Sequence, residues 1–243
     1  MALLKSFLNK IDLDIEKDST KFFLLLISAD IFFILLNIVY LFYDYRGSIN
    51  SIWSIETDRG LAESYQYVKE FWIILLLLWL TVRFSRLSLL TWVSIFTYIL
   101  ADDMLELHER FGDTLSRVIG FKSTFGLRPQ DIGELSFFAI FGIIFSILII
   151  FTYFYNRKDY IFSAVNRRLL LLLGFLALFG AAIDALHSMT GRLSRTWEWP
   201  HLLKIILFFS LGLIEDGGEM IIMSIAVWSI FLLASQFNRE TTR

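Results

Sequence analysis

Three apolar stretches of this sequence carry acidic residues and histidine where a membrane helix tolerates them least. The first reads ADDMLELHERFGD from position 101, the second AAIDALHSMTG from position 181, and the third LIEDGGEM from position 213. Ionisable side chains are costly inside a bilayer, and those found there usually serve an ion, a proton or a substrate. The three stretches are therefore the candidates for a functional site.

Helical phase selects members of the first stretch. At 100° per residue, Glu106, Glu109 and Asp113 all fall within about 40° of Asp102. On the same continuous helix, His108 points about 120° away from this face. We therefore expect the carboxylates to converge and His108 to point elsewhere.

The other two stretches each present a compact group. Asp184 and His187 are i and i+3 neighbours, and they continue a stripe of small residues that favours close helix contact. Glu215 and Glu219 share one helical face, with Asp216 beside them. The predicted metal ligands are Asp102, Glu106, Glu109, Asp184, His187, Glu215, Asp216 and Glu219.

These groups are expected at one depth in the membrane. Asp102 and Asp184 each lie 16 residues beyond a flanking arginine, and Glu219 lies 19 residues before Asn238. At about 1.5 Å per residue the depths are about 24, 24 and 28 Å. In a hydrocarbon core of about 30 Å, the three segments form a single layer near the outer edge.

So many carboxylates in a layer of low dielectric need bound cations, protons or salt bridges with rim arginines. Carboxylates and imidazoles on facing helices bind iron or manganese in helical bundles, and a carboxylate–x–x–His pair belongs to that pattern. Here the pair is Asp184 and His187. The predicted cofactor is a divalent metal ion, with iron, manganese, magnesium, calcium and zinc all left open.

Three classes of function follow from such a layer. The first is a metal-dependent membrane enzyme, an oxidoreductase or a hydrolase, acting on a lipid or another membrane-soluble substrate. The second is a transporter or channel in which the same carboxylates bind a cation or a proton. The third is a non-catalytic membrane subunit. Membrane lipids are the expected partners, and the net charge of −2 gives no basic surface for nucleic acid.

The elements that position these residues are expected to be membrane helices. The chain is 56% hydrophobic with 25 Phe and only 2 Pro, and its mean hydropathy is +0.63. A span needs about 20 apolar residues, which predicts an all-α, polytopic transmembrane helical bundle of about six spans. The predicted spans are Lys21–Tyr43, Glu70–Val82, Leu87–Glu106, Leu135–Tyr155, Arg168–Ser188 and Leu202–Phe237.

Two of these spans have unusual lengths. The second is short and is expected to begin earlier, near Tyr65–Tyr67. The last is too long for one ordinary crossing, so it either projects beyond the bilayer or breaks near Gly217–Gly218. Asp131 and Glu134 have the spacing of a capping box and are interpreted as helix-start residues.

The domain organisation is simple. Residues 1–20 are expected to form a short N-terminal amphipathic helix on the membrane surface, 21–237 a single transmembrane domain, and 238–243 a C-terminal tail. Lys and Arg are densest in the short loops on the side of both termini, which predicts that both termini are cytoplasmic. The absence of cysteine excludes disulfides and thiolate metal ligands.

Overall fold

The computed structural model describes residues 15–44, 51–124, 126–197 and 199–242, and these ranges are helical without a β-strand. The expected all-α bundle is therefore confirmed. Of the predicted N-terminal amphipathic helix, residues 1–14 lie outside the described ranges. The main helices are α2 (Ile15–Asp44), α3 (Leu61–Phe84), α4 (Leu90–Leu105), α5 (Leu107–Ile119), α6 (Pro129–Asn156), α7 (Tyr160–Ala177), α8 (Asp184–Thr196) and α9 (His201–Thr242).

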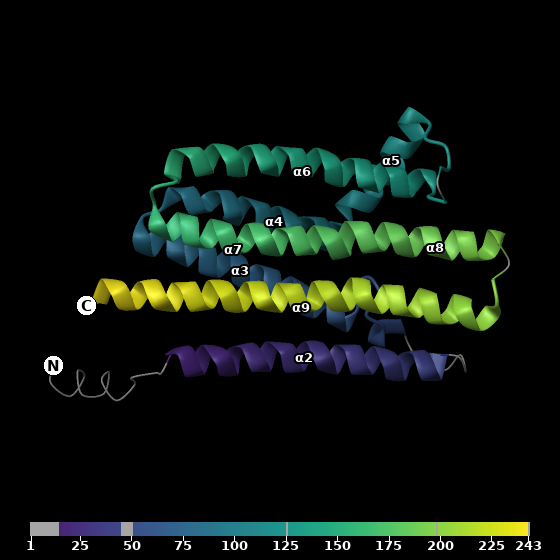
Figure 1. The fold of residues 1–243 in the computed structure, drawn as a ribbon, viewed down its shortest axis with the longest axis horizontal. Helices are drawn as coiled ribbons and strands as arrows, with labels where there is room; N and C mark the ends of the chain where they lie inside the picture. Colours follow the sequence, from purple (N-terminus) through teal and green to yellow (C-terminus); the bar gives the residue numbers. More distant parts are fainter. Residues whose placement is uncertain (1–14, 45–50, 125, 198, 243) are drawn as a thin grey trace.

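Five helical segments are long and apolar enough to cross a membrane. They are Asp18–Leu41, Leu87–Leu105, Pro129–Asn156, Tyr160–Thr196 and His201–Asn238. The remaining predicted span, Glu70–Val82, lies in α3. This helix runs alongside the others in the bundle (Figure 1) but carries Lys69 and Glu70 in its buried face. Figure 1 also shows that α2 begins and α9 ends at the same end of the bundle.

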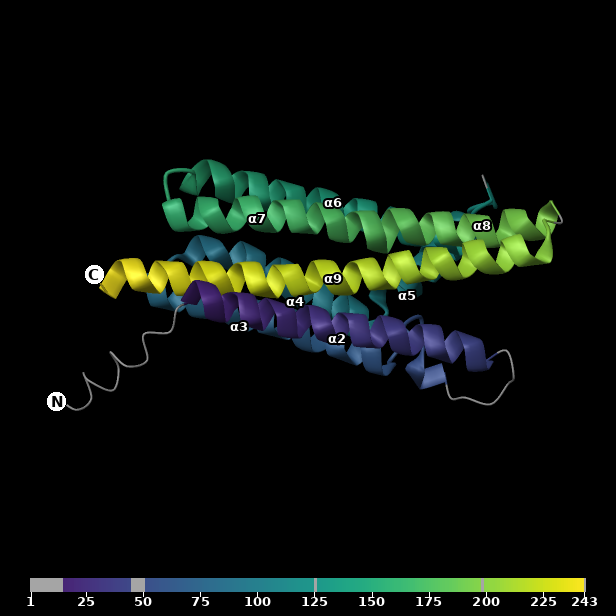
Figure 2. The ribbon, with the colours of Figure 1, turned by 60° about the horizontal axis from the view of Figure 1, so that its bottom comes forward.

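Helix α9 is the centre of the bundle. Figure 2 shows it running between a layer of α6, α7 and α8 and a layer of α2 and α3. Of the two possibilities for this long helix, a break near Gly217–Gly218 does not occur, because α9 is continuous over 42 residues. Gly218 instead allows close packing, because a Cβ there would lie only 2.4 Å from the Phe179 ring, whereas a Cβ on Gly217 would make an ordinary contact with Ile34 of α2 at 3.5 Å.

Helix α4 ends where the sequence predicted continuity. Glu106 adopts a left-handed conformation with φ of 54°, which stops α4 and lets α5 start at Leu107 in a new direction. Helix α5 then packs on the start of α6, where a Cβ on Gly133 would lie 2.1 Å from the carbonyl oxygen of Gly112. This glycine contact fixes the amphipathic α5 across one end of the bundle.

The hydrophobic core fills the half of the bundle where α2 begins and α9 ends. It is formed by α3, α4, α7 and α9, with the side chains of Leu77, Trp92, Phe162 and Ile230 fully buried. The indole of Trp92 donates to the side-chain oxygen of Asn166 at 3.1 Å. The other half of the bundle holds the acidic residues.

A buried ion pair joins α2, α3 and α9 between these two halves. Lys69 Nζ lies 3.0 Å from Asp30 Oδ1, and both side chains are completely inaccessible to solvent. The ammonium also donates to the carbonyl oxygen of Met220 at 2.7 Å and lies over the ring of Tyr65. Because its charge is matched and its protons are used, Lys69 can remain in the apolar interior.

Substitution of Lys69 tests this interaction. Lys69→Met leaves Asp30 buried without a partner, and breaking a buried pair from one side typically costs about 3–5 kcal/mol. We expect a clearly lower thermal unfolding midpoint in detergent micelles. The double variant Lys69→Met/Asp30→Leu should recover most of the loss, and an equally unstable double variant would contradict the role of the pair.

Candidate functional site

A large cavity of about 1720 Å³ lies among α3, α4, α6, α7, α8 and α9. All eight residues predicted as metal ligands line it, although they come from helices far apart in the sequence. They are Asp102, Glu106, Glu109, Asp184, His187, Glu215, Asp216 and Glu219. The structure therefore brings the three acidic stretches to one place, while their role as metal ligands stays a prediction.

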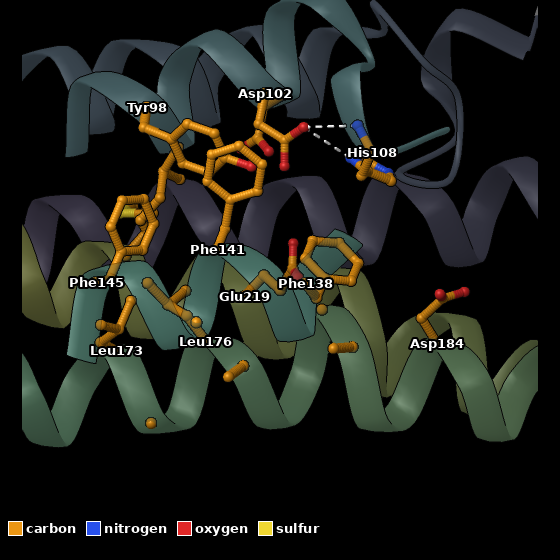
Figure 3. Close-up of a pocket in the computed structure, with 18 of the residues that line it drawn as sticks. Tyr98, Asp102, His108, Phe138, Phe141, Phe145, Leu173, Leu176, Asp184 and Glu219 are labelled. Carbon is orange, nitrogen blue, oxygen red and sulfur yellow. Dashed lines mark hydrogen bonds and ion pairs between the residues drawn. The ribbon is translucent and has the colours of Figure 1, made fainter. Parts of the chain in front are cut away.

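The cavity has an acidic section and an apolar section. In Figure 3, Asp102, Asp184 and Glu219 lie towards one side, and Phe145 and Leu173 lie towards the other. The lining of the apolar section is aromatic and aliphatic, with residues from α4, α6 and α7: Tyr98, Ile99, Phe141, Phe145, Ile149, Leu170, Leu173 and Leu176. A single cavity thus offers both a charged and a hydrocarbon-like environment.

The first carboxylate–imidazole pair stands where α4 ends. Asp102 Oδ1 accepts the backbone N–H of His108 at 2.8 Å and lies 3.2 Å from its Nδ1 (Figure 3). The expectation that His108 points away from the acidic residues is therefore wrong. That expectation assumed one continuous helix, but the left-handed Glu106 resets the helical phase and turns His108 back towards Asp102.

The charge state of His108 follows from these neighbours. Burial alone would lower the pKa of His108, but the carboxylate of Asp102, which lies 3.2 Å from its Nδ1, and those of Glu109 and Glu134 raise it to about 9. His108 is therefore an imidazolium at neutral pH and supplies one positive charge to the acidic section. Burial raises the pKa of the neighbouring Glu109, and the charge of His108 opposes that rise.

The second pair joins α8 to α9. His187 Nδ1 lies 2.9 Å from Glu215 Oε2, and the ring packs edge-on against Phe208. Its other nitrogen, Nε2, is buried without a hydrogen-bond partner among the described residues. Glu56 approaches from the other side, where Gly212 leaves room for its carboxylate, and burial raises the pKa of Glu56. The ring therefore has one nitrogen held by a carboxylate and one free.

Helix α8 is set by a π-helical turn, η3 (Leu178–Ile183), which ends directly before Asp184. Such turns are rare and often occur at functional sites. Gly180 of this turn gives space to Glu219, whose Oε1 would lie 2.1 Å from a Cβ at that position. Ala177 and Ala181 belong to the stripe of small residues that precedes Asp184 in the sequence. Both line the cavity.

A pair of carboxyl groups extends the site inward from the cavity. Asp103 lines the cavity, and its carboxyl group interacts electrostatically with that of Glu70 of α3, which is completely buried. Within the part of the chain that the structure describes, neither oxygen of Glu70 has a hydrogen-bond partner. Two neighbouring carboxylates repel each other when both are ionised.

Sequence reasoning missed several lining residues, and one outer carboxylate is not part of the site. The missed polar residues are Glu56, Asp58, Glu63, Gln66, Asp103, His108, Arg128 and Glu134.

Asp131 does cap α6, as predicted, by accepting the backbone N–H of Arg128 at 2.7 Å. Glu134 has a different role from the one expected, since it accepts a bond from Gln130 and faces the cavity. Asp113, which helical phase grouped with Asp102, forms an ion pair with Arg117 and does not line the cavity.

The polar groups of the acidic section are arranged in pairs rather than in one tight cluster. Among the residues that the structure describes, no group of three or more His, Asp or Glu side chains is close enough to hold a metal ion. The pairs found are Asp102 with His108, His187 with Glu215, and Glu70 with Asp103. In this arrangement they can bind cations, exchange protons and orient a polar group.

Residues 48–235 match the protein family described as "Domain of unknown function (DUF8692)", and the chain belongs to this family. The matched range contains every residue that lines the cavity and leaves out α2. No curated protein and no solved structure matches the chain.

The Asp102–His108 pair should make stability depend on pH. The pKa of His108 is raised from an ordinary value near 6.5 to about 9. Its stabilisation is therefore complete below about pH 6.5 and is lost as the pH rises through about 9. We expect the difference in unfolding midpoint between the protein and His108→Gln to shrink over this window. A difference that is constant or grows with pH would contradict the charged pair.

Proposed function

We propose that this family member is a metal-dependent membrane enzyme that acts on a lipid or another membrane-soluble substrate. The observation that carries the proposal is the joining of an acidic section and an apolar section in one cavity among membrane helices. A simple ion pathway needs polar groups but no hydrocarbon-like pocket. An amphiphilic substrate needs both.

The acidic section is proposed to bind divalent cations. Asp184 and His187 stand on α8, and Glu215, Asp216 and Glu219 stand on α9, which is packed against it. Ions such as Mg²⁺ and Mn²⁺ prefer oxygen ligands, and Mg²⁺ is often held by one or two carboxylates with waters and substrate oxygens. The carboxylates of α8 and α9, which line the same cavity, support this mode of binding. A bound ion would polarise a substrate oxygen or lower the pKa of a water molecule.

His187 is the proposed acid–base group. The carboxylate of Glu215 is hydrogen-bonded to Nδ1 and thereby orients the ring, while the buried Nε2 has no partner among the described residues. In acid–base catalysis a carboxylate commonly holds one imidazole nitrogen so that the other can exchange a proton with the substrate. The geometry of this pair supports such a role for His187.

Cation or proton transport is the second candidate function. The observation in its favour is the inward series of ionisable groups, from Glu219 and Asp103 at the cavity to Glu70 and Lys69 in the interior. Two neighbouring carboxyl groups, such as those of Glu70 and Asp103, are a natural relay element for protons. A non-catalytic membrane subunit, in which these groups only fix helix packing, is the third.

The orientation in the membrane is also a proposal. Arg86 and Asp159, from the two short loops at the end of the bundle where α2 begins and α9 ends, form an ion pair at 3.2 Å. Those loops and the adjoining helical turns also carry Arg83, Arg157, Lys158 and Arg167. Short basic loops favour the cytoplasmic side, so the acidic section would face the non-cytoplasmic side with both termini in the cytoplasm.

Binding of Mn²⁺ tests the proposed function. With purified protein in lipid nanodiscs, loss of the free Mn²⁺ signal in electron paramagnetic resonance measures the bound ion. We expect Asp184→Asn/Glu219→Gln to weaken binding about tenfold or more, because two oxygen ligands lose their charge. Asp113→Asn is the matched control, since Asp113 lies on the surface outside the cavity.

The outcomes separate the three candidates. Mn²⁺ binding that depends on Asp184 and Glu219, without proton or cation flux in liposomes, supports the enzyme. Proton or cation flux that depends on these carboxylates would support transport instead. If replacing the cavity carboxylates by amides leaves folding intact and neither binding nor flux is found, the structural role alone remains.

A further inference from the structure

We propose that the apolar section of the cavity holds the hydrocarbon chain of a long-chain lipid, and that Gly142 and Gly174 keep this section open. The inference rests on the proposed function, because it assigns the lipid's polar head to the acidic section. It adds the class of substrate and two residues that determine which chain is accepted.

Open space at two glycines is the first observation. Gly142 of α6 and Gly174 of α7 both line the cavity, and a Cβ at either position would have no atom within 4 Å. Gly180, one to two turns further along, is different, since a Cβ there would collide with Glu219. The first two glycines therefore do not serve helix packing, and larger side chains would project into empty space.

The length of the cavity is the second observation. From Glu134 in the acidic section, the lining of α6 continues to Ile149 in the apolar section, 15 residues further on, and from Asp184 the lining of the α7–α8 segment continues to Leu170, 14 residues away. At about 1.5 Å per residue both distances are about 21–23 Å. One leaflet contributes only about 15 Å of hydrocarbon, so a lipid whose head lies at the acidic residues and whose chain reaches the end of the apolar section passes the middle of the bilayer.

The lining of this section suits hydrocarbon along its whole length. Tyr98, Phe141, Phe145 and Leu173 face one another across it (Figure 3). Apart from the phenol of Tyr98, the side chains that line it between the acidic residues and Asn166 carry no ionisable group. Burial of a long chain against such a surface is favourable in proportion to the apolar area covered.

Two unpartnered polar atoms mark where the head of the lipid would meet the chain. Gln66 lines the cavity and is only 7% exposed, and its side-chain oxygen has no hydrogen-bond partner among the described residues. The hydroxyl of Tyr98, one helical turn before Asp102, is likewise unpaired within these residues. A buried acceptor and a buried donor without partners are costly. A hydroxyl or a secondary amide near the lipid head, each of which both donates and accepts, would satisfy both.

The absence of cysteine in the chain makes a clean labelling test possible. Ser146 lines the cavity 12 residues from Glu134, about 18 Å along α6, so Ser146→Cys reports on the far part of the apolar section. The probes are simple n-alkylamines, from octylamine to octadecylamine, whose ammonium group complements the carboxylates. The rate of reaction with N-ethylmaleimide is measured in nanodiscs containing chelator.

We expect the long amines to slow the reaction at position 146 at least about threefold and octylamine to leave it unchanged, because only the long chains reach that depth. Adding Gly142→Phe or Gly174→Phe should abolish the protection. The matched controls Ile143→Phe and Leu171→Phe add the same bulk next to each glycine, at exposed positions that do not line the cavity. Ile147→Cys is the control reporter on the lipid-facing side of α6.

Each result decides the inference. Protection that does not depend on chain length, or that the control phenylalanines abolish equally, would overturn it. Mn²⁺ binding is measured on the same variants and should persist in Gly142→Phe and Gly174→Phe. Chain-dependent protection without Mn²⁺ binding would keep the lipid chain site but reject the metal enzyme. Mn²⁺ binding without chain-dependent protection would keep the proposed metal site but reject the lipid chain site.

Discussion

The cost of placing charge in a medium of low dielectric controls this structure. An unpaired ion in such a medium loses several kcal/mol or more of solvation, and the bundle carries acidic groups on several of its helices. It meets that cost in three ways. Lys69 and Asp30 neutralise each other in the interior, imidazoles accompany Asp102 and Glu215, and the other predicted ligands line a cavity rather than packed protein.

These solutions depend on one another through the helices that carry them. The Lys69 ion pair joins α2 and α3 to α9, which fixes the helix that presents Glu215 and Glu219. A tightly packed bundle would have no room for the cavity carboxylates, and the larger hydrophobic cluster accordingly fills the other half of the molecule. Acidic groups at one end of the cavity and hydrocarbon at the other form an amphiphilic surface turned inwards. Such a surface is stable only in contact with water, ions or an amphiphilic ligand, and this requirement connects the architecture with the proposed function.

The sequence by itself determined the class of fold and the set of residues that meet. Span length follows from bilayer thickness, and depth follows from the constant rise of a helix, so the sequence alone assigns Asp102, Asp184 and Glu219 to one layer. These quantities need no knowledge of neighbouring helices. The eight residues predicted as ligands consequently line the same cavity.

Only the tertiary structure decided how those residues pair. Helical phase is valid only while a helix continues, so the left-handed Glu106 made the prediction for His108 wrong. The break considered at Gly217–Gly218 does not occur in the continuous α9, where Gly218 instead gives room to the Phe179 ring of η3. Lys69 was missed because its partner Asp30 is 39 residues away. Contacts between distant segments, and the space left between them, depend on how whole helices pack, which no local pattern in the sequence contains.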